Sequence, residues 1–266
     1  MRLLAFEHDG TFKWRSPLIR GGVGWGSASL ADLDHDGIPE IVIGSNVLNS
    51  SDGSIRWEGA GGRANQGFGS LSIVADLDMD GSPEVVTGST AYRSDGTIYW
   101  SAGADGFPAI GNFDDDAFPE VVVVSSGTVR VVNHDGTPVW GPFAIPGGGE
   151  GGAPTIADFD GDGKAEIGVA GANQYSAFDT DGTLLWSSAT QDGTSRQTGS
   201  SVFDFNGDGN AEVIYGDELF LRIFDGRDGN VLYELPKSSC TTFEEPVVVD
   251  VDADGHAEIV TVANTS

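Results

Sequence analysis

Short hydrophobic runs alternate with acidic and glycine-rich segments along the whole chain. Runs rich in Val, Ile, Phe and Trp are separated by clusters of Asp, Asn and Gly. Between Ala153 and Ser188, for example, the runs are APTIADF, EIGVAG, YSAFDT and TLLWSS. Short runs with turn residues at this spacing predict β-strands of an all-β fold. The pattern predicts no helix.

One acidic unit recurs along the chain: apolar-x-Asp-apolar-Asp-x-Asp-Gly-x-x-Glu-apolar-apolar. Its occurrences are ADLDHDGIPEIV from Ala31, ADLDMDGSPEVV from Ala75, GNFDDDAFPEVV from Gly111, ADFDGDGKAEIG from Ala157, FDFNGDGNAEVI from Phe203 and VDVDADGHAEIV from Val249. The first acidic position falls at residues 32, 76, 112, 158, 204 and 250, so the spacings are 44, 36, 46, 46 and 46. Such regularity indicates a repeat architecture.

A second unit alternates with the first: Asp-Gly followed four residues later by an aromatic residue. It occurs as Asp9-Gly10 with Trp14, Asp52-Gly53 with Trp57, Asp95-Gly96 with Trp100, Asp135-Gly136 with Trp140, Asp181-Gly182 with Trp186, and Asp228-Gly229 with Tyr233. Asp-Gly between apolar runs favours a tight hairpin. Four strands in a period of about 45 residues are typical of a propeller blade. The sequence therefore predicts a six-bladed β-propeller of four-stranded antiparallel blades, forming a single domain over residues 1–266, with the aromatic residues packed between blades.

The chain begins and ends in the middle of a repeat. It opens with the runs LLAFEHDG and TFKWRS, which correspond to strands three and four of a blade, and closes with EPVVVDVD and AEIVTVAN, which correspond to strands one and two. Joining the ends would place Asp32 48 residues after Asp250, close to the internal period. We expect the two halves to pair as the sixth blade and so remove exposed strand edges. The alternative is a fragment of a seven- or eight-bladed propeller.

The acidic unit has the composition of a calcium loop. In the first loop, carboxylates stand at positions 1, 3, 5 and 9 (Asp32, Asp34, Asp36 and Glu40), and Gly37 stands at position 6. Calcium takes six to eight oxygen ligands, mostly carboxylates with a backbone carbonyl. Glycine permits the positive φ of a tight curl. Position 12 is Ile43 rather than Glu, and strands flank the loop, so the unit is not an EF-hand.

The ligands predicted for up to six Ca²⁺ ions are the side chains at positions 1, 3, 5 and 9 and the backbone carbonyl at position 7. They are Asp32, Asp34, Asp36, Ile38, Glu40, Asp76, Asp78, Asp80, Ser82, Glu84, Asn112, Asp114, Asp116, Phe118, Glu120, Asp158, Asp160, Asp162, Lys164, Glu166, Asp204, Asn206, Asp208, Asn210, Glu212, Asp250, Asp252, Asp254, His256 and Glu258.

The six loops are not equivalent in sequence. Asn112 and Asn206 each replace a carboxylate, and Ala117 stands where the other five loops have glycine. Affinity in such loops depends on ligand charge, and a Cβ at positive φ costs about 1 kcal/mol. The loop that begins at Asn112 is therefore predicted to be the weakest, with the loop of Asn206 next.

Charge excludes several classes of partner. The chain has 41 acidic and 13 basic residues, a formal net charge of -28. This surface would repel nucleic acid and anionic lipid, which require clustered cations. A single cysteine, Cys240, excludes an intrachain disulfide, and no apolar run is long enough for membrane insertion. Residues 1–14 lack the apolar region of a signal peptide, which fits a cytoplasmic protein, a mature chain or an excised domain.

The repeats resemble the FG-GAP and VCBS repeats of integrin α-subunit propellers and of many secreted bacterial proteins. Phe68-Gly69, shortly before Asp76, and Gly152-Ala153-Pro154, before Asp158, are similar to parts of the motif that names the family. The resemblance covers nearly the whole chain and implies a calcium-binding propeller with an extracellular or cell-surface location, alone or within a larger protein. Loops of the family often end in Asp at position 9, whereas these end in Glu.

No catalytic constellation is evident in the sequence: a nucleophile elbow, a zinc motif and a phosphate loop are all missing. We therefore expect a non-enzymatic, monomeric module for adhesion or for binding a protein or glycan. The alternatives are a lyase-like, polysaccharide-degrading enzyme on the same fold, and a purely structural spacer. Binding is expected in the variable loops between blades, on the face opposite the metal loops. Its predicted contacts are Trp25, Arg20, Arg63 and Arg196.

Overall fold

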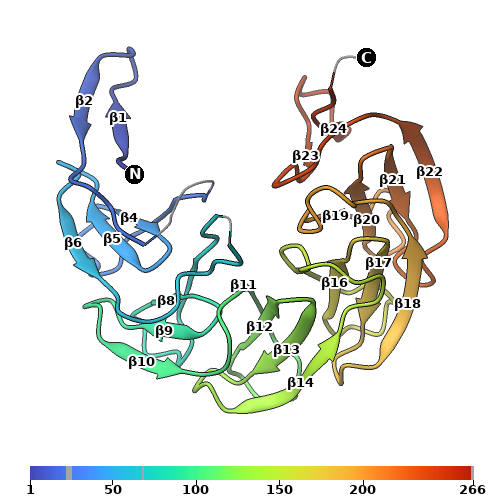
Figure 1. Cartoon of the computed structure of the whole chain (residues 1–266), viewed down its shortest axis with the longest axis horizontal. Coiled ribbons are helices and arrows are strands. Elements are labelled where there is room, and N and C mark those ends of the chain that lie inside the picture. Colours follow the sequence, from blue (N-terminus) through green and yellow to red (C-terminus); the bar gives the residue numbers. More distant parts are fainter. Residues whose placement is uncertain (22–25, 68, 265–266) are drawn as a thin grey trace. The chain divides into compact units, whose positions relative to one another are not determined.

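The computed structural model describes residues 1–21, 26–67 and 69–264 of the chain. In these ranges the regular structure is entirely β, and the strands form antiparallel sheets (Figure 1). No helix long and apolar enough to cross a membrane occurs in the described part of the chain. The all-β class predicted from the sequence is thereby confirmed.

The chain divides into two compact units by its internal contacts. The first comprises Met1–Pro108, Phe118–Ser125 and Val132–Pro138, and the second comprises Ala109–Ala117, Ser126–Val131 and Val139–Ser266.

The first unit contains a two-stranded sheet followed by two four-stranded sheets, each with its strands paired in chain order. The sheets consist of β1 (Leu4–Phe6) and β2 (Phe12–Arg15); of β3 (Ser29–Ala31), β4 (Glu40–Ile43), β5 (Asn46–Asn49) and β6 (Ile55–Glu58); and of β7 (Ile73–Ala75), β8 (Glu84–Val86), β9 (Thr90–Tyr92) and β10 (Ile98–Ser101).

The second unit contains two four-stranded sheets followed by a two-stranded sheet. They consist of β15 (Thr155–Ala157), β16 (Glu166–Ala170), β17 (Gln174–Phe178) and β18 (Leu184–Ala189); of β19 (Ser201–Phe203), β20 (Glu212–Gly216), β21 (Phe220–Phe224) and β22 (Val231–Pro236); and of β23 (Val247–Val249) and β24 (Glu258–Val260). The remaining four-stranded sheet consists of β11 (Phe107–Gly111), β12 (Glu120–Ser125), β13 (Thr128–Val132) and β14 (Pro138–Ala144).

The core lies in the two middle strands of each sheet. Every residue of β16 and β20 is buried, whereas every residue of the outer strand β22 is exposed. Strands that are buried on both faces require continuous apolar runs, which explains EIGVA and EVIYG. In the second unit, Tyr175, Trp186, Tyr215 and Phe224 form one aromatic cluster between two neighbouring sheets.

The tryptophans of the second sequence unit join neighbouring sheets. Each indole N–H donates to a backbone carbonyl in the hairpin turn of the next sheet. The pairs are Trp14 with Ser50, Trp57 with Ser94, Trp100 with His134, Trp140 with Thr180, and Trp186 with Gly226. The prediction that these residues pack between blades is therefore confirmed.

The glycine of each Asp-Gly pair provides the surface on which the preceding tryptophan lies. A Cβ built on Gly53, Gly96, Gly136, Gly182 or Gly229 would lie 2.4–3.0 Å from an atom of that indole ring. All five glycines also have positive φ. Asp-Gly and Trp thus recur together because the turn of one repeat is the contact surface for the tryptophan of the repeat before it.

The ends of the chain carry the two short sheets. The described residues show β1–β2 and β23–β24 as separate two-stranded sheets. The repeats therefore supply five four-stranded sheets and two half-sheets, and closure of a sixth blade stays a prediction.

We expect Gly229→Ala to destabilise the fold strongly, because its Cβ would lie 2.4 Å from the Trp186 ring. The matched control is Gly148→Ala, since φ is +69° at Gly148 and +70° at Gly229, and no atom lies within 4 Å of a Cβ on Gly148. Overpacking typically costs about 1–3 kcal/mol. Denaturant unfolding of both variants should show that additional loss for Gly229→Ala alone; equal losses would contradict the proposed contact.

Candidate metal sites

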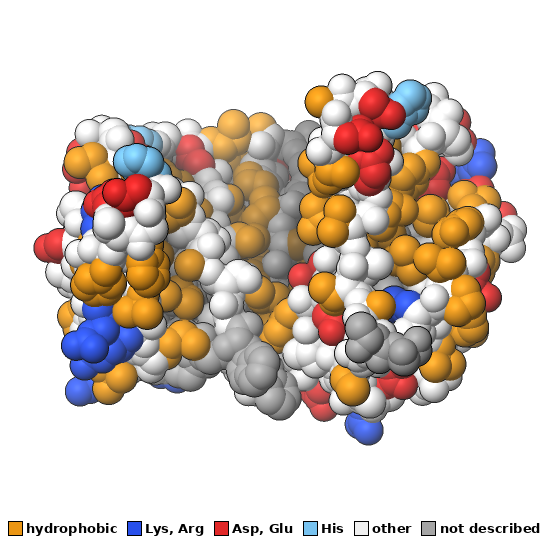
Figure 2. Space-filling view, turned by 90° about the horizontal axis from the view of Figure 1, so that it is seen from above, with side chains coloured by type: hydrophobic (Ala, Val, Ile, Leu, Met, Phe, Trp, Pro, Cys, Tyr) orange, Lys and Arg blue, Asp and Glu red, His pale blue; other side chains and the backbone are white. Residues whose placement is uncertain are grey.

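Each acidic loop connects the first and second strands of a sheet. In all six repeats the glutamate at position 9 is the first residue of the second strand, where it begins β4, β8, β12, β16, β20 and β24. The end of each loop is therefore anchored to a strand. On the surface drawn in Figure 2, acidic side chains gather in compact clusters, some with histidine beside them.

The carboxylate at position 1 curls the loop around itself. Asp32 accepts the backbone N–H of Asp36 at 3.1 Å and that of Gly37 at 3.0 Å. Asp76 and Asp250 bind the corresponding amides in the same way. The glycine at position 6 has φ between 86° and 92° in the five loops that contain it. The predicted role of this glycine is therefore confirmed.

The glutamate at position 9 binds the backbone at the start of its loop. Its Oε2 atom accepts the backbone N–H at position 2 of the loop, at distances of 2.6–3.0 Å, in five repeats. The donors are Leu33, Leu77, Phe159, Phe205 and Val251. One carboxylate oxygen is thus used by the fold, and Oε1 is left to face other partners. An aspartate is one methylene shorter, which gives a physical reason for Glu at this position.

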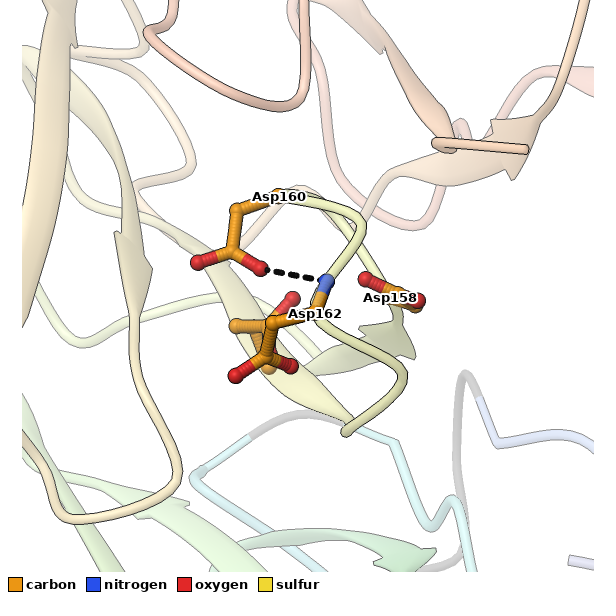
Figure 3. A group of neighbouring side chains, drawn as sticks. Asp158, Asp160 and Asp162 are labelled. Atoms are coloured by element: carbon orange, nitrogen blue, oxygen red, sulfur yellow. Dashed lines mark hydrogen bonds between the residues drawn. The ribbon is translucent and has the colours of Figure 1, made fainter. Parts of the chain in front are cut away.

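Carboxylate oxygens converge in the loops. The fourth loop brings together Asp158, Asp160, Asp162 and Glu166, each with one oxygen within 4.8 Å of the others. Figure 3 shows its three aspartates around the curled backbone, with Oδ1 of Asp160 accepting the N–H of Asp162 at 3.1 Å. Other such groups are Asp32, Asp34 and Asp36; Asp76, Asp78 and Glu84; Asp114, Asp116 and Glu120; and Asp204, Asp208 and Glu212.

The buried glutamates are electrostatically strained. Burial raises the pKa of Glu166 to about 7, against the backbone N–H of Phe159, which lowers it. Glu84 has its pKa raised to about 7 for the same main reason. Glu166 is fully buried, and its Oε1 atom has no hydrogen-bond partner. A buried carboxylate oxygen without a donor fits a cation ligand. The donor set, which consists of oxygen only, fits a hard cation such as Ca²⁺.

The residues at position 7 are held in place by the aspartate at position 5. The backbone N–H groups of Ile38, Ser82, Lys164, Asn210 and His256 donate to this carboxylate at 2.7–2.9 Å. The arrangement fixes the local backbone without using a side chain, which explains why residue types as different as Ile and Lys occur there. Their carbonyls remain predicted ligands.

The two asparagine-containing loops differ from the others. Asn112 donates its side-chain N–H to the carbonyl of Asp116 at 3.0 Å, so its amide serves as a local brace. Ala117 is not among the described residues with positive φ. The backbone strain expected at Ala117 is therefore wrong, because this loop follows a different path. In the fifth loop, Asn206 donates to both Asp208 and Glu212 at 3.1 Å.

The residues predicted to contact a ligand lie in different places. Trp25 falls outside the described residues. Arg20 is exposed in the first unit, and Arg63 lines an open pocket of about 510 Å³ with Ser89, Thr90 and Asp105. Asp105 accepts the backbone N–H of Arg63 at 2.8 Å. In the second unit, the Nε–H of Arg196 donates to Gly193 at 3.3 Å. The sequence did not reveal this pocket, because Ser, Thr and Gly carry no spacing signal.

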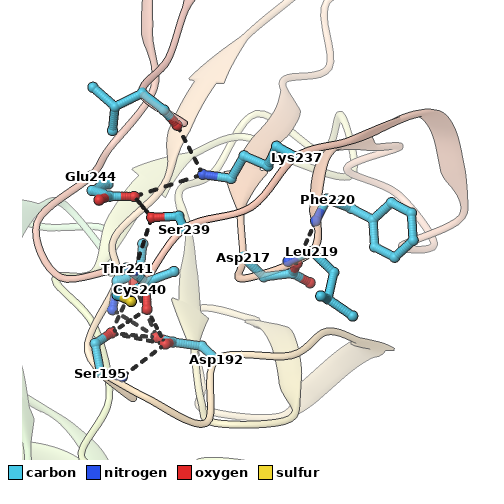
Figure 4. Close-up of polar contacts among 12 residues, drawn as sticks. Asp192, Ser195, Asp217, Leu219, Phe220, Lys237, Ser239, Cys240, Thr241 and Glu244 are labelled. Carbon is cyan, nitrogen blue, oxygen red and sulfur yellow. Dashed lines mark hydrogen bonds and ion pairs between the residues drawn. The ribbon is translucent and has the colours of Figure 1, made fainter. Parts of the chain in front are cut away.

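A buried carboxylate, also unforeseen from sequence, orders the connections in the second unit (Figure 4). Asp192 accepts hydroxyl groups from Ser195, Thr198 and Thr241. Burial by itself raises the pKa of Asp192, but these hydroxyls outweigh that effect and hold the pKa below its ordinary value. Thr241 comes from the connection after β22, so one acid ties together two successive connections. These hydrogen bonds across two connections indicate a structural role.

Comparison with known proteins supports the fold. No curated protein matches the chain in sequence. Among solved structures, the biofilm matrix protein Bap1 of V. cholerae is 20% identical with a TM-score of 0.81, over 97% of this chain and 69% of Bap1. The rhamnogalacturonan lyase PL11 of Bacillus licheniformis is 21% identical with a TM-score of 0.62, over 98% of this chain.

The chain spans half the length of that lyase. BamB from Moraxella catarrhalis is 19% identical with a TM-score of 0.55, over 99% of this chain and 80% of BamB. At these identities the likeness establishes the fold alone. The model of the FG-GAP-like repeat matches residues 112–169, which include the third and fourth acidic loops. The resemblance noted in the sequence is thus confirmed: the chain carries an FG-GAP-like repeat at residues 112–169, in a fold similar to that of β-propeller-like proteins.

Proposed function

We propose that this chain is a calcium-stabilised, extracellular β-propeller that binds a protein or glycan and serves adhesion. The observation that carries the calcium assignment is the fourth loop. There, four carboxylates converge and Oε1 of Glu166 is buried without a hydrogen-bond partner. Bound calcium would supply the missing positive charge. Asp158, Asp160, Asp162 and Glu166 would hold it, and the backbone N–H of Phe159 keeps Glu166 oriented.

A binding role is supported by where the acidic, basic and hydroxyl side chains lie in the chain. The acidic loops are anchored to strands, so their carboxylates serve the scaffold. Arg63 instead lies in a connection between strands, where binding residues commonly occur on rigid scaffolds. The pocket beside it is lined by that connection and by residues at the ends of β9 and β10. Bap1, which is similar in fold, is named a biofilm matrix protein, and this agrees with an adhesive module outside the cell.

We further infer that the ring closes through a sixth aromatic contact. Five tryptophans lie on the glycine of the next hairpin, whereas Tyr233, the equivalent residue of β22, is 51% exposed. Gly10, the glycine of the first hairpin, has no atom within 4 Å of a Cβ built on it. These are the two unmatched members of the series. Following the repeat order, Tyr233 belongs on Gly10, and β1–β2 and β23–β24 form the sixth blade.

Calcium removal should lower the melting temperature. Without metal the loop carboxylates repel one another, and a ligand that binds only the native state adds about 2.7 kcal/mol per site at a hundredfold excess over Kd. Differential scanning calorimetry with EDTA should show a large decrease, which calcium reverses better than magnesium. Glu166→Gln should reduce the calcium effect, and Glu58→Gln, at an exposed strand position, should not. A melting temperature unaffected by EDTA would refute the metal assignment.

Ring closure can be tested with a double-mutant cycle of Gly10→Ala and Tyr233→Ala. Residues in contact show coupling of about 0.5–3 kcal/mol, whereas distant residues are additive within about 0.5 kcal/mol. We expect coupling in denaturant unfolding at a protein concentration at which sedimentation shows a monomer. Additive effects would exclude the contact and favour a fragment of a larger propeller. Coupling that appears only in a dimer would assign it to two copies.

Ligand binding should map to the connections between blades. Alanine substitution of Trp25, Arg20, Arg63 and Arg196 should abolish glycan or protein binding on an array run in calcium, while the melting temperature stays unchanged. Binding that maps to the acidic loops would contradict this surface. Product formation in a polyuronide screen would replace the adhesion proposal with a lyase-like enzyme.

A further inference from the structure

Among the described residues, an arginine pairs with carboxylates of the first, second and fifth acidic loops, and in the first two it bridges two of the predicted ligands. Arg56 places Nη2 2.5 Å from Oδ2 of Asp34 and Nη1 2.9 Å from Oε1 of Glu40 in the first loop. In the second loop, Nη2 of Arg93 lies 3.0 Å from Oδ2 of Asp78, and Nη1 lies 3.3 Å from Oε1 of Glu84. Each guanidinium therefore bridges positions 3 and 9, which are two of the predicted calcium ligands.

The two arginines arrive from different positions in the repeat. Arg56 precedes Trp57 in the outer strand β6, whereas Arg93 follows β9 at the start of the hairpin turn. Arg93 is also held by the ring of Tyr99, whose centroid lies 4.2 Å from the guanidinium carbon. Two different positions of the repeat thus place a guanidinium against the equivalent carboxylates, at positions 3 and 9 of the loop. A requirement for positive charge between positions 3 and 9 would produce this arrangement.

The fourth loop has no such cation. The residue equivalent to Arg93 is Asp179, because both accept the N–H of the turn glycine (Gly96 or Gly182) and both donate to the carbonyl of a threonine four residues on. The equivalent of Arg56 is Leu185, which precedes Trp186. Among the described residues, no ion pair involves the four carboxylates of the fourth loop.

We propose that Arg56 and Arg93 are internal counter-cations that hold the first two loops in shape without metal and lower their affinity for calcium, so that calcium occupies the fourth loop before either of them. The inference rests on the proposed calcium function and refines it. Counting carboxylates makes the first, second, fourth and sixth loops equal, with four each. The guanidinium removes that equality, because an ion entering the first or second loop meets a fixed positive charge on two of its ligands.

Removing the arginine from the first or second loop, and adding one at the equivalent position beside the fourth loop, tests the proposal. We expect Arg93→Met, and separately Arg56→Met, to raise the calcium affinity of one site about tenfold, since affinity follows the charge of the ligand set. We expect Asp179→Arg to weaken the site at Asp158–Glu166 by a similar factor. Isothermal titration calorimetry with calcium measures these affinities. Anomalous scattering from crystals of the native chain at limiting calcium should show an ion at Asp158–Glu166 before one appears at Asp32–Glu40 or Asp76–Glu84. Arg15→Met, which removes the same charge from an exposed position of β2, is the control and should change neither affinity.

Melting in EDTA provides a second measurement that does not depend on calcium. Arg56→Met and Arg93→Met should lower the metal-free melting temperature more than Arg15→Met does, and Asp179→Arg should raise it. Unchanged or weaker calcium binding in the two Met variants, with melting in calcium preserved, would overturn the proposal. So would a first ion at Asp32–Glu40 or Asp76–Glu84. If the native chain binds no calcium, the proposed function fails, whereas the melting series in EDTA still reports whether the arginines stabilise the empty loops.

Discussion

The acidic loops depend on one hydrogen bond, which in five repeats the second residue of the loop donates to the glutamate that begins the next strand. The bond uses Oε2 of the glutamate, as in Glu166 with Phe159. It joins a turn made of carboxylates to a strand of the hydrophobic core. Without that anchor, the repulsion among the aspartates would favour an open loop. With it, the loop is curled before any ion arrives, and burial makes the charge of the glutamate costly until a cation compensates for it.

Neighbouring sheets are joined by a second recurring contact, between a tryptophan and a hairpin glycine. A tryptophan in the outer strand lies on a glycine of the following hairpin and donates its indole N–H to a carbonyl of that turn. Two sequence features that look independent, a turn and an aromatic residue, are therefore two sides of one contact. Because the contact recurs from Trp14 to Trp186, each sheet is held to its neighbour in a similar way.

Within this regular frame the loops have diverged in charge. Among the described residues, the fourth loop has four carboxylates and no ion pair, and the first and second contain a guanidinium that bridges two carboxylates. The third and fifth use an asparagine as a donor, and in the fifth Arg227 also pairs with Asp208. These differences mean that the acidic loops are not electrostatically equivalent. Outside the acidic loops, Asp192 with its three hydroxyl donors fastens two successive connections of the chain.

The repeat period, the strand class, the turn glycines and the positions of the carboxylates could all be predicted from the sequence, because each is a local property of backbone and spacing. The register that makes Glu40 or Glu166 the first residue of a strand follows from the same alternation of polar and apolar residues.

Other features depended on which residues from distant parts of the chain meet. Arg56 lies 22 residues from Asp34, and Thr241 lies 49 residues from Asp192, so no spacing within a motif could reveal either pair. Ala117 shows the converse: the motif predicted strain, but the backbone of that loop was free to take another path. The sequence by itself determined what each repeat is made of, and the tertiary structure decided which charges face one another, because that depends on side chains brought together only by folding.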